Sequence, residues 1–94
     1  MQEENILVSI IIPAWNVEKY ISQAIESCIG QTYTNIEILI IDDGSTDATC
    51  EVVEQYRLKD TRIRLEKKIH AGVSDARNKG IEIATGQAAV FGFG

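Results

Sequence analysis

Two continuous apolar runs, both rich in β-branched residues, lie near the start of the chain with a helical pattern between them. The first run, VSIII, covers residues 8–12 and ends at Pro13, and the second, IEILII, covers residues 36–41. A run without polar alternation is typical of a strand buried on both faces, as in a parallel sheet. Neighbouring parallel strands need a crossover connection, and a helix between the two runs would provide it.

Three helical patterns alternate with the predicted strands. Apolar residues recur at i, i+3, i+4, i+7 and i+8 from Ile21, and this pattern stops at Gly30. A second helix is predicted from an N-cap in the segment 45–47 to about Lys59. The third is predicted from one stripe that ends before Gly86 and consists of Val73, Ala76, Arg77, Gly80, Ile81 and Ala84.

Two shorter strands complete the predicted fold. They are RIRLEKK at residues 62–68 and AAVF at residues 88–91. The resulting order is βαβαβαβ, which predicts an α/β fold with a Rossmann-like parallel sheet flanked by helices. At 94 residues, the chain is expected to form a single domain, residues 1–94.

Composition argues against two classes of function. The formal net charge of −5 does not suit a nucleic-acid-binding surface. The N-terminal sequence MQEEN lacks the features of a secretory signal, and no apolar run approaches the roughly 18 residues of a transmembrane segment. We therefore expect a cytoplasmic protein that binds no nucleic acid and has no transmembrane segment.

Three loops should converge at one edge of the predicted sheet. PAWN (13–16), DDGS (42–45) and IHAG (69–72) each follow the carboxyl end of a strand. Open parallel sheets bind their ligands outside this edge, so the loops predict a ligand site. His70, a lone histidine in one of these loops, is given no catalytic role.

Aromatic and acidic residues in these loops suit a nucleotide. Trp15, with Pro13 shaping the backbone, can stack a nucleobase, or it can fold onto the sheet edge as packing. Asp42 and Asp43 can accept hydrogen bonds from ribose hydroxyls or a base N–H, or help to orient a metal. Alternatively, one of them caps the next helix and pairs with Arg77.

Arg77 lies in the apolar stripe near the start of its helix, where the helix dipole disfavours a cation. An acidic group should therefore face its guanidinium. A phosphate or one of the paired aspartates would fit, since both accept the bidentate fork of arginine. Ligand contact and a structural ion pair both remain open at this point.

Four sequence patterns, in this order and spacing, resemble the N-terminal nucleotide-binding half of family 2 glycosyltransferases of the GT-A fold. They are strand-P-x-W-N, QTY-N-E, DDGS-D and ARN-G, and they extend over residues 8–86. The resemblance implies a transferase that uses a nucleotide-diphosphate sugar, in particular a UDP-sugar, with Mg²⁺ or Mn²⁺ in the full-length enzyme. It assigns nucleotide contacts to Pro13, Trp15, Asp42, Asp43, Arg77 and Asn78.

Within that resemblance, Trp15 takes the place of the aromatic residue that stacks on the base. Asp43 matches the aspartate that contacts the base or ribose, and Asp42 precedes it on the same turn. Arg77 falls on the arginine near the pyrophosphate, beside Asn78. These assignments rest on the resemblance.

The chain departs from the family pattern at two places. After ATG the family continues to an Asp-x-Asp metal motif, whereas this chain reads QAAVFGFG and has Phe93 at the first aspartate position. His70 replaces an asparagine of the preceding loop. We therefore expect no metal site and no catalytic residue in this chain, which would be a truncated, partial domain that is inactive alone.

Two other functions are compatible with these patterns. The chain can be a non-enzymatic nucleotide-binding or self-associating module, forming a homo-oligomer through an exposed sheet edge or its C-terminal tail. A receiver-like signalling domain also carries acidic residues at strand ends. Its usual Lys-Pro pair after a late strand is absent here, because Pro13 is the only proline.

Overall fold

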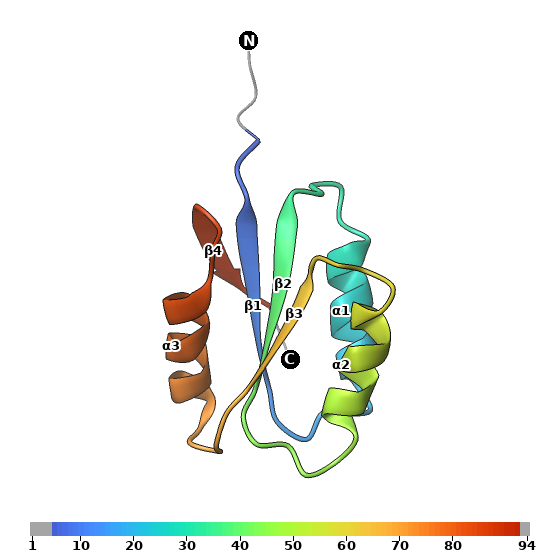
Figure 1. The fold of residues 1–94 in the computed structure, drawn as a ribbon, viewed down its shortest axis with the longest axis vertical. Helices are drawn as coiled ribbons and strands as arrows, with labels where there is room; N and C mark the ends of the chain where they lie inside the picture. The colour runs from blue at the N-terminus through green and yellow to red at the C-terminus, as the bar shows by residue number, and fades with distance from the viewer. Residues whose placement is uncertain (1–4, 93–94) are drawn as a thin grey trace.

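A computed structural model describes residues 5–92 as alternating strands and helices (Figure 1). The elements in chain order are β1 (Val8–Ala14), α1 (Ile21–Ile29), β2 (Ile36–Asp42), α2 (Thr49–Arg57), β3 (Ile63–Lys67), α3 (Val73–Ile83) and β4 (Ala88–Phe91). The predicted βαβαβαβ order is confirmed. No helix within residues 5–92 is long and apolar enough to cross a membrane.

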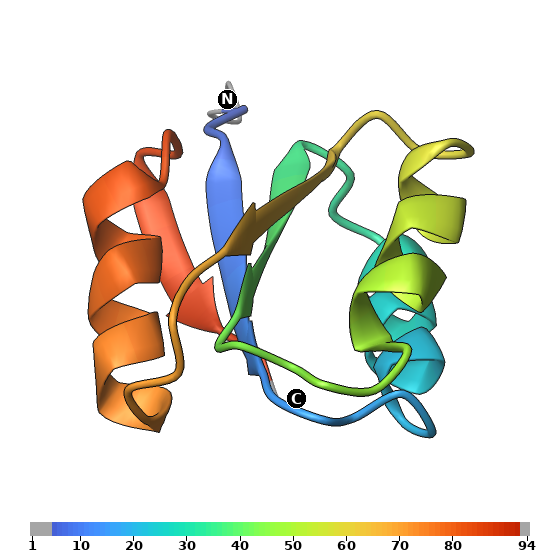
Figure 2. The ribbon, with the colours of Figure 1, turned by 60° about the horizontal axis from the view of Figure 1, so that its bottom comes forward.

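The sheet is fully parallel and has the strand order β3-β2-β1-β4. The first three strands are added in one direction along the sheet, from β1 to β2 to β3. Helix α3 then carries the chain back across the sheet, so that β4 lies beside β1 at the other edge. Helices α1 and α2 cover one face and α3 covers the other, as both ribbon views show (Figures 1 and 2). This is the predicted Rossmann-like arrangement, and its carboxyl edge is where such sheets bind ligands.

Alternation along β1 and β2 accounts for their continuous apolar sequences. One face of the sheet packs against α1 and α2 through Ile10, Ile12, Ile38 and Ile40. The opposite face packs against α3 through Ile11, Leu39 and Ile41, which join Ala76 in a second cluster. Because successive side chains of a strand point to opposite faces, a strand covered on both sides is apolar at most positions, and Ser9 and Glu37 are the polar exceptions whose side chains bond to each other.

Strand β1 continues through Pro13 to Ala14, so the prediction that it ends at Pro13 is wrong. The Ala14 carbonyl accepts a hydrogen bond of 2.8 Å from the Asp43 amide of the neighbouring segment. In a parallel strand the backbone groups of successive residues bond alternately to the two neighbouring strands, so the backbone nitrogen of Pro13 faces β4. There the pairing ends at Ile11 with Phe91, and the missing N–H of proline costs no ladder bond.

Helix α2 is shorter than predicted. It ends at Arg57 rather than near Lys59, and its N-cap position is Ala48, whose side chain makes no capping bond. Asp47, one of the three predicted N-cap candidates, lies one position earlier and still serves the helix start, since its carboxylate accepts the amide of Thr49 at 3.0 Å. The predicted segment 45–47 thus ends one residue before the N-cap position.

The buried stripe of α3 is narrower than predicted. Ala76 and Gly80 are buried, whereas Val73 and Ile81 are 52% and 56% exposed. A Cβ atom at Gly80 would lie 2.3 Å from a methyl carbon of Ile11, so the helix packs on β1 through its smallest residues. Close packing through so few small side chains leaves the larger flanking ones in solvent.

A buried carboxylate holds the turn that follows α3. Glu37, at the start of β2, accepts hydrogen bonds from the Ser9 hydroxyl at 2.5 Å, the Thr85 amide at 2.8 Å and the Arg64 guanidinium at 2.9 Å. The Ser9 oxygen in turn accepts the Gly86 amide at 2.9 Å. Burial alone would raise the pKa of Glu37, but these hydrogen bonds outweigh it and the pKa lies below its usual value.

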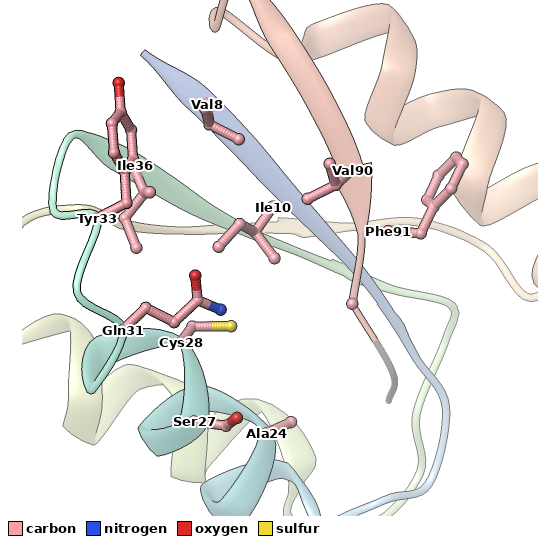
Figure 3. Close-up of a pocket in the computed structure, with 11 residues that line it drawn as sticks. Val8, Ile10, Ala24, Ser27, Cys28, Gln31, Tyr33, Ile36, Val90 and Phe91 are labelled. Carbon is pink, nitrogen blue, oxygen red and sulfur yellow. The ribbon is translucent and has the colours of Figure 1, made fainter. Parts of the chain in front are cut away.

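An apolar groove of about 410 Å³ lies between α1 and the β1–β4 half of the sheet (Figure 3). Val90 points into it, whereas Phe91, the next residue of β4, points toward α3. Both side chains are half exposed. Within residues 5–92, β4 pairs only with β1, so its outer edge has no neighbouring strand.

Candidate functional site

The three loops predicted to converge do meet at the carboxyl edge of the sheet. They form a pocket of about 230 Å³ with contributions from the ends of β1, β2 and β3 and from the start of α3. Its lining residues are Pro13, Ala14, Trp15, Val17, Asp43, His70, Gly72 and Val73. Three of the six predicted site residues, Pro13, Trp15 and Asp43, therefore share one pocket.

The loop that carries Trp15 is fastened to the loop after β2. Asn16 adopts a left-handed conformation with φ of 52°, which asparagine tolerates better than most residues. Its side-chain oxygen accepts a hydrogen bond from the Thr46 backbone amide at 2.8 Å, and the backbone amide of Asn16 donates to the Ser45 hydroxyl at 2.9 Å. Trp15 is thus held by its neighbour while its indole remains 50% exposed.

Asp43 lies at the centre of the hydrogen bonds at this edge and is only 3% exposed. One carboxylate oxygen accepts from the Lys68 ammonium at 2.8 Å and the Ala71 amide at 3.0 Å. The other accepts the Gly72 amide at 2.9 Å and lies 2.9 Å from Nδ1 of His70. A carboxylate has about four lone-pair positions, and here the loop between β3 and α3 supplies four partners.

These partners control the ionisation of Asp43. Burial by itself would raise the pKa, but hydrogen bonds from Lys68, Ala71 and Gly72 and the charge of Lys68 lower it to about 2. The carboxylate is therefore ionised at neutral pH. In this arrangement it orders the loop that leads into α3.

Asp42 points away from this pocket, because adjacent residues at a strand end face opposite sides of the sheet. It is 2% exposed, and one of its oxygens accepts the Ser45 amide at 3.1 Å. The other oxygen has no hydrogen-bond partner among the described residues. Burial, together with the nearby Asp42 carboxylate, raises the pKa of Cys50 on α2 to about 11, so that thiol is protonated.

Arg77 and Asn78 are exposed on α3 and do not line the pocket. The guanidinium of Arg77 lies 5.6 Å from the centre of the Phe91 ring. No acidic side chain pairs with Arg77 among the described residues, where an aromatic ring stabilises the cation instead, and the alternative of a phosphate partner stays a prediction. The alternative in which Arg77 pairs with Asp42 or Asp43 is excluded by the same geometry.

Sequence reasoning missed the residue Lys68 and the contact that His70 makes. Lys68 bridges Asp43 at 2.8 Å and Asp75 of α3 at 2.7 Å, and these hydrogen bonds raise its pKa. His70 stacks on Trp15, with ring centroids 4.7 Å apart and an angle of 24° between the rings. A cation directly after β3, opposite two aspartates, was a usable signal for Lys68, whereas nothing local indicated the stack.

The acidic residues at this edge do not fit a divalent cation. All four acceptor positions of Asp43 face nitrogen atoms of the loop 68–72, one of them an ammonium, and Asp42 is directed to the other face of the sheet. Among residues 5–92 no group of three or more His, Cys, Asp or Glu is arranged to hold a metal. Phe93, the position expected for the first metal-motif aspartate, lies outside the described residues.

A doubly wound parallel sheet with an aromatic ring and a buried carboxylate at its carboxyl edge has the architecture of α/β ligand-binding domains. Comparison with protein families makes this more specific. Residues 9–93 match Glycosyl transferase family 2, and the chain belongs to that family. The resemblance inferred from the sequence patterns is thereby confirmed.

Relatives and solved structures agree with this membership. The chain is 45% identical over 80 residues to the uncharacterized glycosyltransferase EpsJ of Bacillus subtilis, covering 85% of this chain and 23% of EpsJ. It superposes with a TM-score of 0.84 and 31% identity on S. aureus TarS 1-349 in complex with UDP, covering 92% of this chain and 26% of that one. The chain thus spans about a quarter of the length of these proteins.

A more distant structure shares the fold. The mannosyltransferase PcManGT from Pyrobaculum calidifontis, in complex with GDP-Man and Mn²⁺, gives a TM-score of 0.82 at 24% identity and covers 89% of this chain and 26% of that one. The fold is therefore that of a part of the GT-A glycosyltransferases, as predicted.

Proposed function

We propose that this chain is the nucleotide-binding portion of a family 2 glycosyltransferase and that its carboxyl edge binds the uridine diphosphate part of a UDP-sugar. The observation that carries the proposal is the half-exposed Trp15 beside the buried, ionised Asp43 in one pocket. The likeness to TarS, which is described in complex with UDP, supports the choice of nucleotide.

Each residue has a distinct part in the proposed binding. The Trp15 indole stacks the uracil, and Pro13 fixes the strand end from which the indole projects. Asp43 keeps the loop 68–72 in place and turns toward the base or ribose when a ligand exchanges with its loop partners. Arg77 and Asn78, exposed on the first turns of α3, are directed to the diphosphate, and Asp42 supports the turn beneath the site.

Sugar transfer requires more than these contacts. In the whole enzyme, bound Mg²⁺ or Mn²⁺ would neutralise the charge on the departing diphosphate. The described residues do not fit such a metal. We therefore propose that this chain alone binds the nucleotide without transferring the sugar.

Titration with UDP tests the proposal. Isothermal calorimetry should detect binding by the wild-type chain, and Trp15→Ala should weaken it by about fivefold to 150-fold, because base stacking on an aromatic ring contributes about 1–3 kcal/mol. Leu58→Ala, which removes an exposed apolar side chain remote from the pocket, is the matched control. Equal affinity of the wild type and Trp15→Ala would remove base stacking from the proposal.

The exposed outer edge of β4 favours a second function, self-association. We propose that two copies pair through this edge, because an uncovered edge strand with half-exposed Val90 and Phe91 is a template for strand pairing. Light scattering at micromolar concentration should report a dimer. Val90→Lys should return the mass to that of a monomer, whereas Leu58→Lys should not; a monomeric wild type contradicts the pairing.

A further inference from the structure

We infer that His70 regulates access of the nucleobase to Trp15: its imidazole covers the indole face beside Asp43, where a base that contacts both residues would stack. The inference rests on the proposed function and concerns the same pocket. In it, His70 competes with the ligand rather than contacting it. The base and the imidazole are alternative partners of one aromatic surface.

The geometry of the stack leaves no space for a third ring. The two ring centroids are 4.7 Å apart and the planes differ by 24°, which is an ordinary offset stack. A base inserted between the rings would have to separate them to about 7–8 Å, twice the optimal distance between carbon atoms. On this face of Trp15, a base therefore has to displace the imidazole.

The backbone of His70 is fixed by the loop after β2. Gly44 has φ of +79°, and a Cβ atom there would lie 2.9 Å from the His70 amide nitrogen. Only glycine allows so close an approach of the two loops, and it also tolerates the left-handed conformation. The position from which the imidazole projects is therefore set by the fold.

The side chain of His70, in contrast, has room to rotate into solvent. It is 53% exposed, and its polar contacts are from Nδ1 to the Asp43 carboxylate at 2.9 Å and to the Asp43 carbonyl at 3.0 Å. The other charged groups nearby, Lys68 and through it Asp75, already bond to each other and to Asp43. Rotation into solvent would free the indole and would leave those ion pairs intact.

Two states of the pocket follow from this arrangement. With the imidazole on Trp15 the indole is covered on that face, and with the imidazole in solvent the indole is available to a base. The apparent affinity for a nucleotide is lowered by the fraction of molecules in the covered state. Removing the ring should therefore tighten binding, which is the opposite of the effect expected for a ligand-contacting residue.

The sequence makes this directly measurable, because Trp15 is the only tryptophan and His70 the only histidine. In His70→Asn without nucleotide, acrylamide should quench the indole emission more strongly than in the wild type. The affinity for UDP should rise about threefold to tenfold, the range expected for removing one competing aromatic contact. Leu58→Ala, at an 88% exposed side chain outside the pocket loops, should change neither quantity.

The possible outcomes separate this inference from the proposed function. UDP binding by His70→Asn that is equal to or weaker than that of the wild type overturns the inference and leaves the proposed function intact, since UDP is still bound. Failure of both proteins to bind UDP overturns the proposed function and the inference with it. Circular dichroism confirms that the variants are folded, and His70→Gln repeats the test with another non-aromatic side chain.

Discussion

Asp43→Asn is expected to lower the free energy of unfolding by about 3 kcal/mol at pH 7. The substitution keeps the shape of the side chain but removes the charge that faces Lys68 and one acceptor for the amides of Ala71 and Gly72. Breaking a buried ion pair from one side typically costs 3–5 kcal/mol, and the retained Lys68–Asp75 contact favours the lower end. Urea denaturation of both proteins measures the difference.

Asp75→Asn is the matched control for this measurement. It removes the other carboxylate that bonds Lys68, but that carboxylate is 53% exposed. Exposed ion pairs contribute about 0–1 kcal/mol, so this variant should unfold at nearly the wild-type urea concentration. Equal losses in the two variants would show that burial of Asp43 is not what makes its contacts stabilising.

The contribution of Asp43 should depend on pH in a defined direction. Its pKa is lowered from 3.8 to about 2 in the folded chain, so folding favours the ionised form. The resulting stabilisation, about 2 kcal/mol, is fully present above the unfolded-state pKa and is lost as the pH falls through the folded-state pKa. The difference between wild type and Asp43→Asn should therefore narrow between about pH 5 and pH 2. A constant difference would contradict an electrostatic origin.

The order of elements was predictable because it depends on local periodicity. The continuous apolar runs of β1 and β2 could only suit strands covered on both faces, and the structure covers them with helices on both faces. The stripe of α3 was predicted less well. Its contact with β1 depends on the small residue Gly80 opposite Ile11, and hydrophobic periodicity carries no information on such a fit.

The candidate site was predictable as a place, since parallel topology alone brings the loops together. Which side chains share the pocket depends on the face of the sheet to which each of them points. Asp42 and Asp43 are neighbours in sequence, yet strand alternation sends Asp42 toward α2 and Asp43 toward the loop before α3. The stack of His70 on Trp15 joins residues 55 positions apart and depends on the backbone of Gly44, so no local pattern could indicate it.

Glu37→Ala is expected to lower the free energy of unfolding by about 4 kcal/mol. The carboxylate is the shared acceptor for the Ser9 hydroxyl, the Thr85 amide and the Arg64 guanidinium, and its residue is only 7% exposed. Truncation leaves these donors without their partner, at a cost of roughly 1–3 kcal/mol for each one that stays buried. Glu54→Ala, which breaks an exposed pair with Arg57, should cost less than about 1 kcal/mol.

Glu37 and Asp43 lie at opposite ends of β2, and each bonds to one end of the α3 segment. Asp43 accepts the amides of Ala71 and Gly72 before the helix, and Glu37 accepts the Thr85 amide after it. The helix itself offers only a narrow buried face, so we expect these two carboxylates to help hold it to the sheet. In hydrogen-exchange measurements, Glu37→Ala should therefore accelerate the exchange of α3 amides, relative to the wild type, more than that of α1 amides. Equal acceleration of both helices would show that Glu37 stabilises the fold as a whole and not α3 in particular.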